Sequence, residues 1–196
     1  FNPFDTDIDT VMGKPTGYVT LNPLRRFNNN CNLSNGNLTA TGSNDSYPGV
    51  AADIALTSGK WYYEFQIDSK TSNPMCGVIQ NNYWSGGSGR VLYRADGAYI
   101  TAAGSEPTDP SSFGVGDIIG VVIDLDDTAG YIRFYKNGVL EPVVSDLSDL
   151  KSDLSISTLG GLLPYLQMYT NDVCTVNYGQ KPFKFPPPEG FQPLNY

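Results

Sequence analysis

Residues 60–68, with the sequence KWYYEFQID, alternate side chains in the way that suits an extended strand. One face carries Trp61, Tyr63, Phe65 and Ile67, and the other carries Tyr62, Glu64, Gln66 and Asp68. Because the side chains of a strand repeat with a period of two, this pattern predicts a half-buried β-strand.

A second stretch predicts an antiparallel hairpin. Its first arm places Ile119, Val121, Ile123 and Leu125 on one side, and its second arm alternates Ile132 and Phe134 with polar residues. The pair Asn137-Gly138 then marks a tight turn, because Asn and Gly tolerate a positive φ.

Shorter segments with the same character predict further strands. They are expected at residues 17–21, 38–41, 76–80, 90–93, 163–169 and 173–178, separated by clusters rich in Gly, Pro, Asn, Asp and Ser. Many short strands separated by such turn-forming clusters favour an all-β fold, a two-sheet antiparallel β-sandwich or jelly roll. One short helix is expected within residues 145–154, capped by Ser145 or Asp146 and burying Leu147, Leu150 and Leu154.

Composition excludes several kinds of function. The chain has 12 Lys and Arg against 20 Asp and Glu, a net charge of -8, which disfavours nucleic acid or an anionic membrane as partner. It has no His, which removes His-activated nucleophiles and His-ligated zinc. No apolar run approaches the length of a membrane span, so no membrane insertion is expected.

The three cysteines, Cys31, Cys76 and Cys174, do not form a metal-binding or redox spacing. An odd number cannot pair completely within one chain. We therefore expect three small buried apolar side chains, with no disulfide needed for folding.

The order of the motifs, SGKWYYEFQI, CGVIQ, GVGDIIGVVIDLDDTAGYIRFYKNGV and LLPYLQMYTNDVCTVNYGQKPF, resembles the SPRY domain. The matching residues are Gly59, Tyr62, Glu64, Gly77, Val78, Gly116, Asp117, Gly120, Asp124, Phe134, Asn137, Gly138, Pro164 and 177–179. The resemblance implies a SPRY-like sandwich of the concanavalin or jelly-roll type without a catalytic centre. It also implies a binding surface built from loops at one end.

The resemblance also suggests the limits of the domain. Residues 40–185 would form the sandwich, with residues 1–39 as N-terminal strands and extended chain packing on it. The Pro-rich tail, residues 186–196, would lead to a further domain of a longer polypeptide. We expect the segment 181–196 to lie along the sandwich as extended chain, with Phe183, Phe185 and Phe191 as anchors.

The ending YGQKPF followed by PPEGF, and the opening FNPFDTDIDTV, look similar to SPRY-like domains in virion proteins of bacteriophages and marine viruses. That likeness implies a tail-fibre or appendage protein that recognises a host-surface protein or glycan, or other virion proteins. It leaves room for a homo-oligomer, a trimer in a fibre. The alternatives are an intracellular adaptor in the cytoplasm that reads a short peptide, and a structural capsid-decoration or spacer domain.

Exposed aromatic residues on loops give the candidate binding site, because they offer large contact area at low entropic cost. Three loops qualify, at residues 44–49, 80–88 and 169–172, and the resemblance brings them to the family's binding end. The predicted ligand-binding residues are Tyr47, Tyr83, Trp84, Tyr93, Arg94, Asp96, Tyr169, Asn171 and Asp172.

Acidic clusters give weaker candidates for metal binding or catalysis. Asp124, Asp126 and Asp127 do not fit a calcium loop, since Ala129 stands where an EF-hand needs Gly. Asp5, Asp7 and Asp9 share one face of an extended start. A glycosidase would need two paired carboxylates, and only four Glu exist, Glu64, Glu106, Glu141 and Glu189. We therefore expect no enzyme, no metal site and no cofactor.

Overall fold

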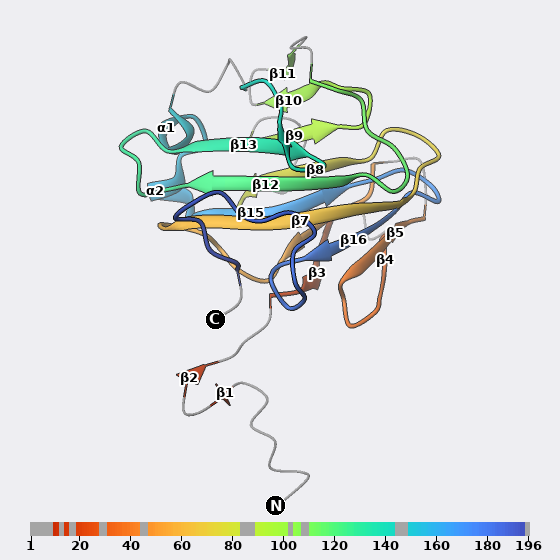
Figure 1. Cartoon of the computed structure of the whole chain (residues 1–196), viewed down its shortest axis with the longest axis horizontal. Helices are drawn as coiled ribbons and strands as arrows, with labels where there is room; N and C mark the ends of the chain where they lie inside the picture. Colours follow the sequence, from red (N-terminus) through yellow and green to blue (C-terminus); the bar gives the residue numbers. More distant parts are fainter. Residues whose placement is uncertain are drawn as a thin grey trace, which may run out of the picture.

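Two seven-stranded antiparallel sheets pack face to face and form a β-sandwich (Figure 1). The structure is a computed structural model, and it describes residues 10–11, 14–15, 19–27, 31–43, 47–82, 89–101, 104–106, 110–143 and 149–194. The predicted all-β sandwich is confirmed.

We name each sheet after its central strand. The β8 sheet has the order β11 (Gly104–Glu106), β10 (Tyr99–Thr101), β9 (Arg90–Arg94), β8 (Met75–Gln80), β15 (Leu162–Gln167), β6 (Gly49–Ala52) and β3 (Leu21–Phe27). The β7 sheet has the order β14 (Val139–Leu140), β13 (Tyr131–Lys136), β12 (Ile118–Asp124), β7 (Lys60–Ser69), β16 (Val173–Asn177), β5 (Thr39–Gly42) and β4 (Cys31–Ser34). Ahead of both, β1 (Thr10–Val11) pairs with β2 (Lys14–Pro15).

Strand β7 confirms the alternation that was read from the sequence, with one addition. Tyr63, Phe65 and Ile67 enter the core between the sheets. Tyr62 and Glu64, on the opposite face, are buried as well, although the sequence pattern predicts a half-buried strand. The tail, residues 181–194, covers that face, because Phe183 packs edge-on against Tyr62 with ring centroids 4.8 Å apart.

The predicted hairpin is also confirmed. Strands β12 and β13 pair from Ile119 with Lys136 to Asp124 with Tyr131. Asn137 and Gly138 form the following turn with φ values of 50° and 80°, the left-handed region that these residue types tolerate. The turn leads directly into the short edge strand β14.

Other predictions needed correction. Of the strand expected at 17–21, residues 17 and 18 lie outside the described residues, and β3 begins at Leu21. It continues to Phe27 despite Pro23, because β3 is an edge strand with a bulge. Helix α1 (Leu150–Asp153) is capped by Asp149, whose side chain accepts from the Ser152 amide. Ser145 and Asp146, the predicted caps, lie outside the described residues. A second short helix, α2, spans Ile156–Leu159.

Glu64 fastens the tail to the β7 sheet. Its carboxylate, 3 % exposed, accepts hydrogen bonds from the amides of Lys184 at 2.9 Å and Phe185 at 3.0 Å. It also accepts from the hydroxyl of Tyr62 at 3.1 Å. Farther along, the Tyr62 amide donates to the carbonyl of Gln192, so the tail pairs with β7 as extended chain. The tail therefore lies along the sandwich, as expected, but residues 189–190 form a turn, and residues 195–196 lie outside the described residues.

The three cysteines are buried free thiols in β4, β8 and β16, as expected. Burial raises the pKa of the Cys31 thiol to about 12, and it also raises the pKa values of Cys76 and Cys174. Because the thiolate is the reactive form, all three side chains are protected both by access and by protonation.

The substitution Glu64→Ala should release the tail and lower the free energy of unfolding by about 2 kcal/mol, because it leaves two partly buried amides without an acceptor. Urea unfolding measures the loss, and trypsin should cut faster after Lys184. Glu189→Ala, an exposed acid on the same tail, is the control and should change neither. Equal unfolding and cleavage of Glu64→Ala and wild type would contradict the tail's attachment through Glu64.

Iodoacetamide at about pH 8 should leave all three cysteines unmodified in the folded chain, since both access and ionisation are suppressed. The same reagent in denaturant should modify all three. Intact mass measured before and after unfolding checks this, and rapid labelling of any one cysteine in the native chain would contradict the described core.

Candidate binding surface

Four of the predicted site residues meet at one end of the β8 sheet. The strand register brings Met75 opposite both Arg94 and Gln167, and Gln167 opposite Gly49. Tyr47 precedes β6, Tyr169 follows β15, and Arg94 and Asp96 lie where β9 turns into β10. We call Tyr47, Arg94, Asp96 and Tyr169 the tyrosine rim.

The two tyrosines of the rim contact each other directly. Their ring centroids lie 4.5 Å apart with the planes tilted by 58°. Burial, together with a hydrogen bond to the Tyr47 hydroxyl, raises the pKa of Tyr169. Tyr47 remains 45 % exposed, so the pair offers an aromatic surface with polar hydroxyls to solvent.

Arg94 and Asp96 add a fixed ion pair beside the rings. The Arg94 Nε donates to Asp96 Oδ1 at 2.7 Å, and this hydrogen bond is the main cause of the lowered pKa of Asp96. The Ala98 amide donates to the same oxygen at 3.3 Å, within a turn closed by the Arg94 and Ala98 backbones. The pKa of Arg94 is raised, mainly by its hydrogen bond to Asp96 and less by Tyr169 and Tyr47, so its guanidinium lies in the neighbourhood of the aromatic pair.

Asp172 supports the rim from below. Its side chain is completely buried and has a structural role, so it is not accessible for the predicted contact with a ligand. Oδ1 accepts from the amides of Thr71 at 2.7 Å and Ser72 at 3.1 Å, and Oδ2 accepts from the Tyr169 amide at 2.9 Å. The carboxylate thus joins the loops that follow β7 and β15. Asn171, exposed with φ 63°, makes the turn between Tyr169 and Asp172.

Tyr93 also lies in the interior, not on the surface. Its ring packs among Tyr99, Phe113 and Phe134, with centroids 4.9–5.5 Å away. Its hydroxyl donates to the carbonyl of Ser111. The alternation of β9 explains the correction, since Tyr93 faces the core while Arg94, its neighbour, faces outward.

The three candidate loops do not share one end of the sandwich. Gln80 and Gly89, which flank the 83–88 segment and are joined by a hydrogen bond, lie at the opposite end of β8 from Met75. Five residue steps of strand separate the two ends by roughly 17 Å. Asn81 there bonds Gly160 and Arg25. Tyr83 and Trp84 themselves lie outside the described residues.

The acidic candidates serve the fold where they are described. Asp124 accepts from the amides of Asp126 and Asp127 at 2.9 Å each and from Lys60 Nζ at 2.9 Å. Burial alone would raise the pKa of Asp124, but these hydrogen bonds outweigh it and lower the pKa. Glu141 accepts from the Ser111 amide at 2.7 Å. Asp5, Asp7 and Asp9 lie outside the described residues.

The described part of the chain has neither a metal-binding cluster nor a membrane-spanning helix. It contains no group of three His, Cys, Asp or Glu side chains arranged to hold a metal ion. Within those same residues, no helix is long and apolar enough to cross a membrane.

Sequence reasoning missed the residues that hold the rim in place. Thr71 and Ser72 donate to Asp172, and Pro48 accepts the amide of Met168 through its carbonyl. The only available signal was the Thr-Asn-Asp run at 170–172, which is typical of a turn closed by an Asp side chain. Its partners are about 100 residues away in sequence, so no local pattern indicates them.

Comparison with known proteins agrees with this architecture. Solved structures that match include the crystal structure of the SPRY domain of human HERC1, with a TM-score of 0.68, 22 % identity, and coverage of 83 % of this chain and 99 % of that one. Among curated proteins, E3 ubiquitin-protein ligase RKP of Arabidopsis thaliana is 28 % identical over 162 residues. That match covers 76 % of this chain and 11 % of the plant protein, so the chain spans about a tenth of that relative.

The family comparison is more direct, because it addresses the motifs themselves. The model of the SPRY domain matches residues 60–181, which is well over half of the 196 residues and includes β7 to β16. Those motifs lie on strands of both sheets and on the β12–β13 hairpin described above. The chain therefore belongs to the SPRY domain family.

Proposed function

We propose that this chain is a non-catalytic recognition domain that binds a segment of a partner protein through the tyrosine rim. The single observation that carries the proposal is the contact between exposed Tyr47 and half-buried Tyr169 beside the Arg94–Asp96 ion pair. Tyrosine and arginine are the residue types that contribute most to protein interfaces. Membership of the SPRY family, whose domains are protein-interaction modules, supports the same function.

The rim is held in one geometry before any partner arrives. Asp172 fixes the backbone of Tyr169, and the turn at residues 94–98 fixes Arg94 and Asp96. A surface ordered in advance loses less conformational entropy on binding, which favours recognition by a single, compact site. The tyrosine hydroxyls and the guanidinium can hydrogen-bond the backbone of an extended peptide, while the rings contact its side chains.

The chemistry of the buried acids supports recognition over catalysis. Glu64, Glu141 and Asp172 each accept hydrogen bonds from backbone amides, and Asp124 is also paired with Lys60. A carboxylate whose oxygens are occupied by backbone amides is fixed in position and is not free to exchange a proton with a substrate. With no His in the chain, no imidazole is available for proton transfer either.

The setting of the domain is a separate matter. It stays a prediction from the sequence that the domain belongs to a virion appendage, binds a host-surface glycan and forms a trimeric fibre. The alternatives, a cytoplasmic location and a spacer role, also stay predictions. The named relatives are plant and human proteins, one of them a ubiquitin ligase by name, which favours a protein partner over a sugar. We therefore infer a peptide segment as the ligand in either setting.

A library of displayed twelve-residue peptides, selected on the immobilised chain, tests the function. We expect enriched peptides whose affinity falls at least about tenfold in Tyr47→Ala and in Arg94→Gln, because each removes a central contact. Tyr131→Ala is the matched control, since Tyr131 is a partly exposed tyrosine on the other sheet. Fluorescence anisotropy of a labelled peptide gives the affinities.

Two results would overturn the proposal. One is a selected pool that binds Tyr47→Ala and Arg94→Gln as tightly as wild type, which would move recognition off the rim. The other is a folded chain that enriches no peptide but gives a saturable signal on a neutral glycan array, which would make it a sugar-binding domain.

A further inference from the structure

A groove of about 350 Å³ opens on the outer face of the β7 sheet, on the other side of the sandwich from the β8 sheet. Residues of the tail line one side, and residues of the β13–β14 hairpin line the other. Its lining is mainly apolar and aromatic, with Tyr62, Tyr135, Val139, Phe185, Pro186 and Pro188. We call it the tail groove.

The walls of the tail groove are fixed by packing and hydrogen bonds. The Phe185 ring lies so close to Gly138 that a Cβ there would fall 2.6 Å from it. Asn137 Oδ1 accepts from the Ile118 amide at 2.9 Å, and its Nδ2 donates to Asp117 at 2.7 Å. Because Glu64 anchors the tail, this hollow is built into the folded chain.

Exposed apolar side chains continue from the groove along the hairpin. Val139 is 68 % exposed, and Leu140 and Val143 follow at 46 % and 59 %. These three are half of the large hydrophobic side chains that are exposed in the described residues, and they fall within five positions. Strand β14 is also an edge strand, bonded to β13 alone in the described sheet. Such a cluster on an edge is typical of a contact surface.

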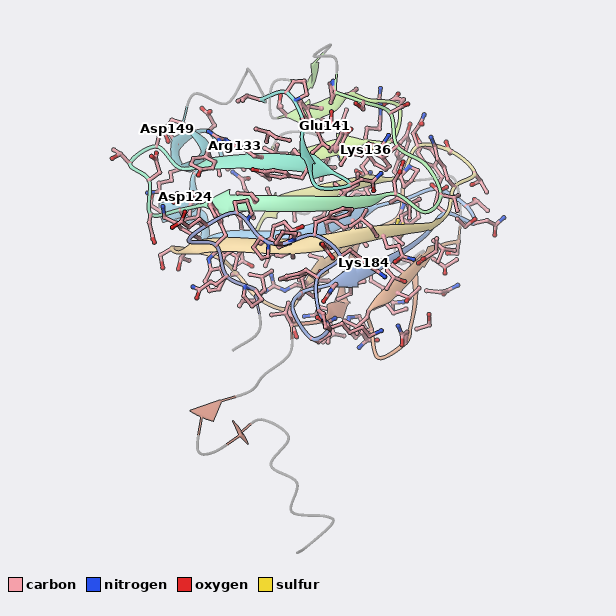
Figure 2. The ribbon with its side chains drawn as sticks, in the orientation of Figure 1. Asp124, Arg133, Lys136, Glu141, Asp149 and Lys184 are labelled. Atoms are coloured by element: carbon pink, nitrogen blue, oxygen red, sulfur yellow. The ribbon has the colours of Figure 1, made fainter. Side chains whose placement is uncertain are left out.

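A second hollow of about 280 Å³ lies beside the groove, and its lining includes both apolar and charged residues. It is lined in part by Lys181, Lys184, Gln66 and Ile118. The two hollows adjoin, because Phe185 lines the first and its neighbour Lys184 the second. Figure 2 labels Lys184 of the tail and Arg133 of β13, and Arg133 alternates with the core residues Ile132 and Phe134, so it faces outward from the same sheet.

Charge indicates what the second hollow prefers. Lys181 and Lys184 are exposed cations on a chain whose net charge is -8. The acid in this hollow, Glu64, already accepts hydrogen bonds from two amides and the Tyr62 hydroxyl, which compensates its charge. A carboxylate from outside would therefore meet two exposed ammonium groups.

We propose that the tail groove and the adjoining lysines form a second docking site, for an extended acidic peptide segment of a partner protein. One apolar side chain of the segment fills the groove between Val139 and Phe185. A carboxylate within two residues of it reaches Lys181 and Lys184. The site is separate from the tyrosine rim and does not depend on the proposed function, and together the two surfaces would let one domain hold two segments.

Selection of the same type of displayed peptide library, run on wild type and on Val139→Glu in parallel, tests this site. Peptides enriched on wild type alone should carry an apolar residue with Asp or Glu within two positions. Their affinity should fall at least about tenfold in Val139→Glu and about threefold in Lys184→Ala, and it should weaken as salt is raised. Val139→Ser, which adds no charge, should show an intermediate loss.

Val115→Glu is the matched control, because Val115 is 64 % exposed and the substitution adds the same charge elsewhere. It and Tyr47→Ala should bind these peptides like wild type, and thermal unfolding should match for all the variants. The proposal is overturned if no peptide distinguishes wild type from Val139→Glu, or if the distinguishing peptides carry no excess of Asp and Glu. It is also overturned if the chain alone forms a concentration-dependent dimer that Val139→Glu abolishes, since the occupant would then be a second copy.

Discussion

Hydrogen bonds from backbone amides to buried carboxylates hold the periphery of this sandwich on its core. A buried carboxylate without donors is costly, so each of these acids stabilises the fold only while its amide partners stay in place. Glu64 binds the tail, Asp172 binds the loops at one end, and Asp124 shapes the β12–β13 turn. Glu141 does the same for the segment after β14. The binding surfaces proposed for this chain are built on segments that these acids position.

The alternation of side chains predicted the middle strands of the β7 sheet well, because the core-facing side chains of those strands recur at every second position. β7, β12 and β13 appear where the period of two places them. The small-residue strand β6 escaped prediction, since its Gly49 is required by the Tyr165 side chain, whose hydroxyl occupies the place of a Cβ. Tyr165 lies more than a hundred positions away from Gly49 in the sequence, so no local pattern indicates this requirement.

The candidate site was predicted in residue types more reliably than in arrangement. Tyr47, Arg94, Asp96 and Tyr169 meet as the resemblance suggested, because the antiparallel register brings their strand ends together. Tyr93 is buried because it lies on the core-facing side of β9. The sequence of a five-residue strand does not show which of its two sides faces the core. The flanks of the 83–88 segment lie at the opposite end, because they connect β8 to β9 at the end of β8 away from Met75.

These observations describe a SPRY domain in which a rigid sandwich presents an ordered aromatic and charged rim. The central claim is that recognition takes place at that rim, not at the opposite end near Asn81 and Gly160. Amide chemical shifts of the ¹⁵N-labelled chain, titrated with the most enriched peptide from the selection, test it most directly. The account predicts the largest changes at Tyr47, Arg94 and Tyr169. Changes confined to Asn81, Arg90 and Gly160 would contradict it.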